Sequence, residues 1–143
     1  MKISMACDHG GYDLKETLKV YLEEKGYEVK DCGCDSKESC DYPDFAGVAA
    51  KDVAAGISDK GIVICTTGIG VSIVANKVKG VRAALCHNEY TAKMTRLHNN
   101  SNVLAMGAGI LSQEEAKKVT DTFLETEFSE EERHQRRIDK IES

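Results

Sequence analysis

GIVICTTGIGVSIVAN, residues 61–76, is the stretch that says most about how the chain folds. The run GIVIC at its start is almost wholly apolar, which is typical of a strand covered on both faces of a parallel sheet. Gly68 and Gly70 then allow a tight turn, and SIVANKV continues with a helical pattern. The stretch therefore predicts a buried strand, a glycine-rich turn and a helix in direct succession.

Short apolar runs alternate with amphipathic stretches on both sides of this segment. The pattern predicts strands at residues 2–7, 27–32, 61–65, 81–86 and 102–106. Helices are predicted at residues 12–25, 43–56, 72–78, 88–98 and 113–126. Because strands joined by helices pair in parallel, we expect an α/β fold, a Rossmann-like three-layer αβα sandwich with a five-stranded parallel sheet. A further charged helix, at about residues 129–142, is more than this sheet requires.

Length and composition narrow the class of protein. A chain of 143 residues fits one domain, residues 1–143, and its formal charge of -5 disfavours general nucleic-acid binding. The apolar run at the N-terminus is too short for a signal segment, and no stretch approaches the length of a membrane span. We therefore expect a cytoplasmic protein that binds neither membrane nor nucleic acid, and whose six cysteines are reduced.

The residues that leave the strands are the candidates for chemistry, since such sheets bind ligands beyond the carboxyl ends of their strands. Around Gly68 and Gly70, peptide N–H groups can converge on an anion at a helix N-terminus, although the glycines could equally do no more than close the turn. Ile73 stands where a dinucleotide motif needs its third glycine, and no P-loop lysine follows. We therefore expect no cofactor.

Cys65, Asp8 and His9 each have two readings at this edge of the sheet. A thiolate is stabilised at a helix N-terminus, so Cys65 could be a base or a nucleophile, but a free cysteine is commonly a small buried hydrophobic residue. Asp8 and His9 follow the first strand together and could contact a ligand, while Asp8 could instead cap a helix.

Three further groups of residues also allow a chemical and a purely structural interpretation. His98 ends a predicted helix, where acid–base work competes with a capping role, whereas His87 is expected to be structural. Arg133 and Arg137 are four residues apart and suit a phosphate, but could instead pair with the neighbouring glutamates. Cys32, Cys34 and Cys40 lack a C-x-x-C pair and a fourth ligand, so we expect no metal site.

Five segments together resemble the ribose-5-phosphate isomerase B family, which also includes galactose-6-phosphate isomerase subunits. They are CDHGGYDLK, DYPDFA, GIVICTTGIGVSIVANK, MTRLHNNSNVLAMG and RHQRR. The segments occur in the family's order, and the likeness runs from residue 1 nearly to the C-terminus. It is therefore far more specific than any single motif.

The resemblance implies reversible isomerisation of ribose 5-phosphate to ribulose 5-phosphate through a cis-enediolate, without metal or coenzyme. It implies that Cys65 moves a proton between sugar C2 and C1, that Thr67 assists it, and that His98, with Asp8 nearby, opens the furanose ring. The implied anion hole for the enediolate is the backbone of Gly68, Ile69, Gly70, Val71 and Ser72. The implied phosphate ligands are His9, Arg133 and Arg137, and the other implied substrate contacts are Tyr42 and Asn99.

The family's oligomeric state is also part of what the resemblance implies. Members are dimers or tetramers in which the residues matching His98 and Asn99 enter the neighbouring subunit's site. We therefore expect a homo-oligomer with composite active sites, and a C-terminal helix that serves both phosphate binding and assembly.

The chain departs from the family pattern at two places near the site. Thr66 replaces the second residue of the usual C-G-T-G, and Gly109 stands where many members carry an arginine that reaches phosphate from a neighbouring chain. A six-carbon substrate such as allose 6-phosphate or galactose 6-phosphate therefore stays open. A non-catalytic phosphosugar-binding subunit is the other alternative, although the base, its threonine and the ring-opening histidine are all present.

Overall fold

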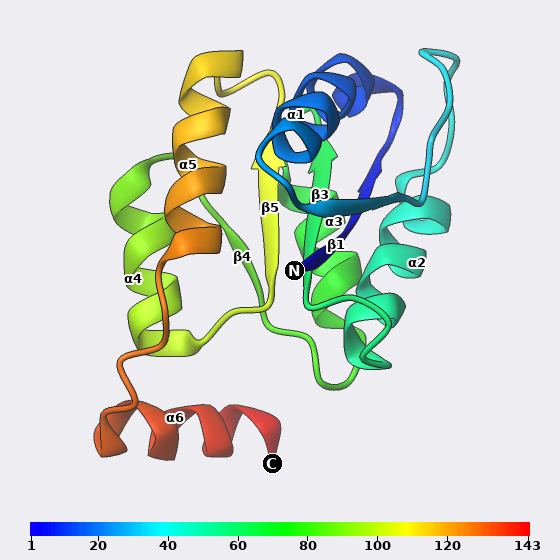
Figure 1. Cartoon of the computed structure of the whole chain (residues 1–143). Helices are drawn as coiled ribbons and strands as arrows, with labels where there is room; N and C mark the ends of the chain where they lie inside the picture. The colour runs from blue at the N-terminus through cyan, green and yellow to red at the C-terminus, as the bar shows by residue number, and fades with distance from the viewer.

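Five parallel strands form the centre of the computed structural model, which describes residues 1–143 (Figure 1). The strands lie in the order β2-β1-β3-β5-β4. Their bounds are β1 (Lys2–Cys7), β2 (Glu28–Asp31), β3 (Lys60–Cys65), β4 (Ala83–Leu85) and β5 (Val103–Gly107). The predicted five-stranded parallel sheet is confirmed. The strand predicted at residues 81–86 is shorter than expected, because the backbone N–H of Arg82 bonds the side chain of Asn102 instead of a strand.

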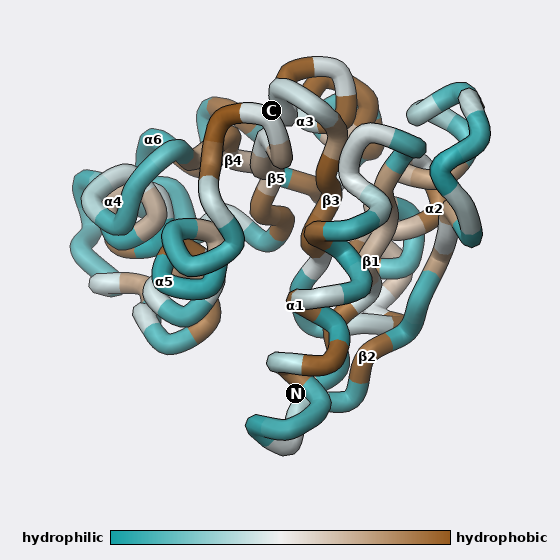
Figure 2. Tube along the Cα trace, turned by 90° about the horizontal axis from the view of Figure 1, so that it is seen from above, coloured by the Kyte–Doolittle hydropathy of each residue, from teal (hydrophilic) through white to brown (hydrophobic).

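Helices cover both faces of the sheet, as Figure 2 shows in a view from above. One face carries α1 (Tyr12–Glu24) and α5 (Gln113–Glu125), and the other carries α2 (Tyr42–Ala54) and α3 (Ile69–Asn76). Beside α5 lies α4 (Glu89–Asn99), and α6 (Glu132–Glu142) packs against α4. A short 3-10 turn, η1 (His9–Gly11), precedes α1 and was not predicted.

The central strand β3 shows why its sequence is so apolar. Ile62 and Ile64 pack into the core under α1 and α5, while Val63 and Cys65 face α2 and α3. Residues 62–64 are fully buried. Each buried aliphatic side chain contributes about 1.5–3 kcal/mol relative to exposure, so a strand apolar on both sides is stable only between two helical layers. This confirms the prediction of a doubly covered strand.

The strand order creates a crevice beside β1. The chain passes from β1 to β2 on one side, whereas β3 pairs with β1 on the other. The backbone N–H of Asp8 donates to the carbonyl of Ile64 at 3.2 Å, which places Asp8 next to Cys65. The carboxyl ends of β1 and β3 are therefore where a doubly wound sheet binds its ligand.

The last helix lies across the opposite end of the molecule, where the strands begin (Figure 1). Its residues His134 and Ile138 are buried, and Arg82 pairs with Glu142 at 2.8 Å. None of the helices has the length and apolar character that crossing a membrane requires.

Candidate active site

The turn that follows β3 depends on Gly68. Its φ of +80° lies in the left-handed region, and a Cβ there would be 2.5 Å from Leu85 Cδ1 and 2.7 Å from the backbone carbon of Met106. Any other residue would therefore be strained in its backbone and would also displace its neighbours. This glycine lets the chain reverse directly from β3 into α3.

Some of the N–H groups at the start of α3 donate hydrogen bonds within the chain, and others do not. Gly68 donates to Cys65 Sγ at 3.1 Å, and Ile69 donates to Thr67 Oγ1 at 3.2 Å. Ser72 donates to the carbonyl of Gly68 as a regular helical bond. The N–H groups of Gly70 and Val71 form no hydrogen bond within the chain. Gly70 lines a hollow at the surface, whereas Val71 is fully buried, so within residues 68–72 the N–H of Gly70 is the unbonded donor that a ligand can reach.

Cys65 lies at the bottom of a hollow of about 450 Å³. The residue is 6% exposed, and its sulfur accepts the hydrogen bond from Gly68. No hydrogen bond joins Cys65 to Thr67, whose hydroxyl oxygen is engaged by Ile69. Cys65 is thus part of the buried core between β3 and α2 and also lines the hollow.

Asp8 borders the same hollow and also caps η1. Its Oδ1 accepts from the N–H groups of Gly10 at 2.9 Å and Gly11 at 3.2 Å, which confirms the capping reading. Oδ2 forms no hydrogen bond within the chain. One oxygen is therefore structural, while the other is free to contact a ligand.

A second hollow, of about 550 Å³, adjoins the first through Asp8 and Tyr42. His9 lines it, and its Nδ1 accepts from the backbone N–H of Cys40 at 3.2 Å, so a neutral ring carries its proton on Nε2. The ring of Tyr42 lies against the glycine turn, since a Cβ on Gly70 would be 2.7 Å from Tyr42 Cζ. Together the hollows form one groove along the carboxyl ends of β1 and β3.

The other predicted site residues lie at the opposite end of this chain. His98 and Asn99 end α4, which runs back to the start of β5, and Arg133 and Arg137 are on α6 (Figure 1). Within one chain Asp8 and His98 lie at opposite ends of the fold, so the expected nearness of Asp8 to His98 requires the His98 of a neighbouring subunit. The reason is topological: a helix between parallel strands ends at the edge where strands begin.

The side chains at that opposite end are mostly exposed. The ring of His98 stacks on that of His134, with centroids 4.3 Å apart. Arg133 pairs with Glu131 at 3.2 Å, as the alternative reading of the charged run predicted, whereas Arg137 has no ion-pair partner. Asn99 accepts from Thr95 Oγ1 at 3.1 Å through its side-chain oxygen. His87 is exposed and lies apart from both groups of site residues.

His134 is a residue that sequence reasoning missed. Burial, together with the nearby His98 and Arg133, lowers its pKa from the usual histidine range, and Glu131 partly offsets the shift. The available signal was its spacing of four from Ile138, which places both on the one buried face of an otherwise charged helix.

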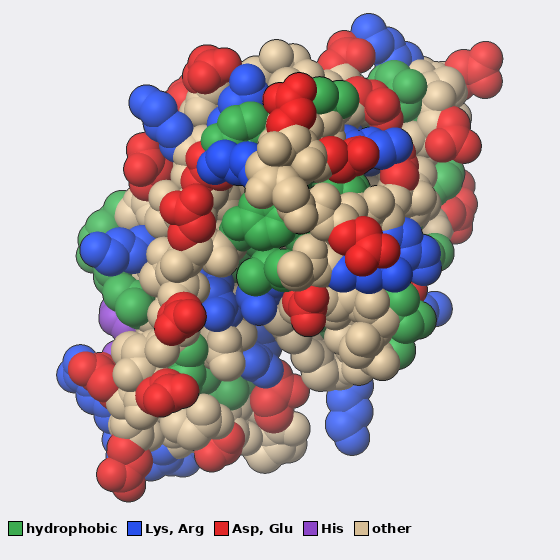
Figure 3. Space-filling model, in the orientation of Figure 1, with side chains coloured by type: hydrophobic (Ala, Val, Ile, Leu, Met, Phe, Trp, Pro, Cys, Tyr) green, Lys and Arg blue, Asp and Glu red, His purple; other side chains and the backbone are tan.

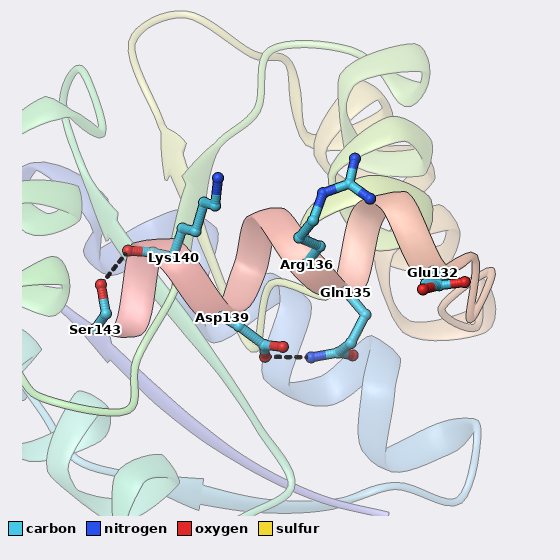
Figure 4. Close-up of a pocket in the computed structure, with 6 residues that line it drawn as sticks. All are labelled: Glu132, Gln135, Arg136, Asp139, Lys140 and Ser143. Carbon is cyan, nitrogen blue, oxygen red and sulfur yellow. Dashed lines mark hydrogen bonds between the residues drawn. The ribbon is translucent and has the colours of Figure 1, made fainter.

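The other hollows of the surface share no lining residue with this groove. A shallow hollow along α6 is lined only by residues between 132 and 143, and Gln135 donates to Asp139 within it at 2.8 Å (Figure 4). On the face shown in Figure 3, positive and negative side chains are interspersed. All six cysteines are free thiols.

Comparison with known proteins finds one family whose model matches nearly the whole chain. The model of a family described as Ribose/Galactose Isomerase matches residues 3–141. Ribose-5-phosphate isomerase B of Escherichia coli is 45% identical over 140 residues, covering 98% of this chain and 93% of that protein.

Solved structures agree with the sequence comparison. A ribose-5-phosphate isomerase B from Clostridium thermocellum superposes with a TM-score of 0.98 at 48% identity, covering 99% of this chain and 95% of that one. The enzyme of the same name from Mycoplasma genitalium, solved with bound ribulose 5-phosphate, gives a TM-score of 0.94 at 44% identity, covering 99% and 93%.

Proposed function

The chain belongs to the ribose/galactose isomerase family, and on that premise we propose that it interconverts ribose 5-phosphate and ribulose 5-phosphate. One observation carries the proposal. Cys65 Sγ lies at the end of β3 and lines a groove together with Gly70, whose N–H at the start of α3 is unbonded. A proton-transfer group next to an unfilled site for negative charge is what enediolate chemistry requires.

The reaction needs a base that takes a proton from one carbon and returns it to the next. In the proposed step the Cys65 thiolate removes the proton from sugar C2, which leaves a neutral thiol and a cis-enediolate. The thiol then protonates C1, while a hydroxyl proton moves between O1 and O2, so that no atom or electron is gained or lost. Asp8 Oδ2 and the hydroxyl hydrogen of Thr67 have no partner within the chain, so both are free to assist the transfer of the proton between O1 and O2.

Negative charge that develops on the enediolate oxygens would be met by backbone donors. The N–H of Gly70, at the start of α3 and in the lining of the groove, has no partner within the chain. One such preorganised donor is worth about 3 kcal/mol in a transition state. The left-handed φ of Gly68 and the ring of Tyr42 beside Gly70 define the shape of the turn that presents this donor.

The residues at the other end of the chain are proposed to serve the site of a second copy. His98 would open the sugar ring, Asn99 would contact the substrate, and Arg133 and Arg137 would join the partner's His9 at the phosphate. The support is that these four side chains lie far along the fold from Cys65 and mostly face outward. Ile69 and Ile73, at 53% and 55% exposure, supply an apolar surface beside the groove for the partner. We therefore propose a homo-oligomer, a dimer or a tetramer.

The direct test of the base is the variant Cys65→Ala. We expect turnover of ribose 5-phosphate to fall at least about a thousandfold, since the proton-transfer group is lost, with an unchanged circular dichroism spectrum. Cys32→Ala is the matched control, because that half-buried thiol lies outside the groove and should leave turnover unchanged. Near-normal activity of Cys65→Ala would remove Cys65 from the role of base.

A six-carbon phosphosugar is the second candidate substrate. Thr66 lines the groove, and a Cβ at Gly109 would lie 3.0 Å from Thr66 Cγ2, so the two departures from the family pattern are in contact. Catalytic efficiencies on ribose 5-phosphate, allose 6-phosphate and galactose 6-phosphate decide between the candidates. We expect ribose 5-phosphate to lead. A cytosolic location is proposed as well, because six free thiols suit a reducing compartment.

A further inference from the structure

Thr66 occupies an unusual place between two glycines from distant parts of the chain. A Cβ built on Gly10 would overlap Thr66 Oγ1, and a Cβ on Gly109 would lie 3.0 Å from Thr66 Cγ2. The hydroxyl therefore faces Gly10 and the end of β1, while the methyl group faces the segment after β5. Thr66 thus occupies the space that Gly10 and Gly109 leave open by having no side chain.

The hydroxyl of Thr66 is also unpaired. It forms no hydrogen bond within the chain, in contrast to Thr67, whose hydroxyl accepts from Ile69. Thr66 is exposed and lines the same hollow as Cys65 and Asp8. A hydroxyl that belongs to a residue lining a ligand groove and that lacks a protein partner is available as a donor and acceptor for a ligand.

We propose that Thr66 is a specificity-determining residue whose hydroxyl binds a hydroxyl group of the phosphosugar chain. The proposal rests on the proposed function for the identity of the ligand. Asp8 Oδ1, the oxygen that caps η1, lies on the same side, 3.4 Å from the place that a Cβ on Gly10 would take, so the Asp8 carboxylate and the Thr66 hydroxyl are neighbours. Gly10 and Gly109 are then needed for this contact as well, because side chains there would displace Thr66.

The test separates the hydroxyl from the methyl group. Thr66→Val keeps the volume and removes the hydroxyl, whereas Thr66→Ser keeps the hydroxyl and removes the methyl. Affinity for ribose 5-phosphate is measured by calorimetry in a Cys65→Ala background, where turnover does not interfere. We expect Thr66→Val to weaken binding about five- to tenfold, the worth of one neutral hydrogen bond, and Thr66→Ser to stay within about twofold.

Kinetics supply a readout that a merely structural role would not move. With Cys65 intact, Thr66→Val should raise KM by a similar factor and leave kcat within about twofold, because the contact is made equally in ground and transition states. Thr66→Ala is the reserve variant if Thr66→Val fails to fold. Equal affinities for the valine, alanine and wild-type side chains would overturn the proposal, and so would an equal loss in Thr66→Ser.

Failure of this inference is distinguishable from failure of the proposed function. A wild-type protein that binds ribose 5-phosphate without turning it over would contradict the isomerase proposal, yet the calorimetric comparison of Thr66 variants would still decide the role of the hydroxyl. Normal turnover with no effect of Thr66→Val would contradict only the role of Thr66.

Discussion

The two ends of the molecule carry site residues of different kinds. At the carboxyl ends of β1 and β3, Cys65 and Asp8 are buried, and the proposed ligand donor is a backbone N–H that follows a glycine turn. At the other end, His98, Arg133 and Arg137 are exposed side chains on α4 and α6. We propose that the first end serves the reacting charge and that the long side chains of the second bind phosphate in another copy.

The largest change in unfolding free energy is expected at the glycine turn after β3. Gly68→Ala forces a side chain into the left-handed region and against Leu85 and Met106, so we expect a loss of about 2–4 kcal/mol in unfolding free energy. Gly56→Ala is the matched control, because Gly56 also has a positive φ, +75°, but open space around it. Its loss should be only about 1 kcal/mol in urea unfolding. Equal losses in the two variants would mean that the turn is not tightly packed.

A smaller, local effect is expected at the other end. Ile138→Ala removes the buried anchor of α6, 4% exposed, so the free energy of opening this helix should fall by about 2 kcal/mol. Hydrogen exchange measures it, with protection lost in α6 and retained in β3. Ile141→Ala, at a side chain 61% exposed, should change neither. Loss of protection throughout the sheet would show that the two ends are not independent.

The smallest expected effect is the pH dependence of the docking of α6. The pKa of His134 is lowered in the folded state, so the undocked helix takes up a proton more readily than the docked one. Docking of α6 is therefore complete above the ordinary histidine pKa of about 6.5 and weakens as pH falls below it. Hydrogen exchange of α6 at about pH 7.5 and 5.5, corrected for intrinsic rates, measures this. His134→Gln should remove the dependence, and an unchanged slope in that variant would assign it to another group.

Much of the fold followed from local patterns, and the site followed only in part. The doubly buried run at residues 61–65 and the helical spacing around it needed no long-range information to interpret. The free N–H groups of Gly70 and Val71 also follow from a helix beginning directly after a glycine turn. By contrast, the orientation of Thr66 depends on Gly10 and Gly109, which follow other strands. No local pattern in the sequence encodes that packing.

The separation of Asp8 from His98 follows from the connectivity of the sheet. Every helix between parallel strands returns to the starting edge of the sheet, so a residue that ends a helix cannot lie beside one that ends a strand. Topology alone thus separates Cys65 from His98 within one chain. It could not show that α6 packs on α4 through His134 and Ile138, since that depends on side-chain contacts.

The central claim, that one copy supplies Cys65 and another supplies His98, is tested most directly by subunit complementation. Cys65→Ala and His98→Ala are each expected to be inactive alone, while a mixed dimer of the two contains one site with both residues intact. Co-expressed and purified mixed dimers should regain a large share, up to about half, of the wild-type kcat per dimer for ribose 5-phosphate. If they stay as inactive as the parent variants, although mass spectrometry shows that mixed dimers have formed, both residues act in the same chain and the account is contradicted.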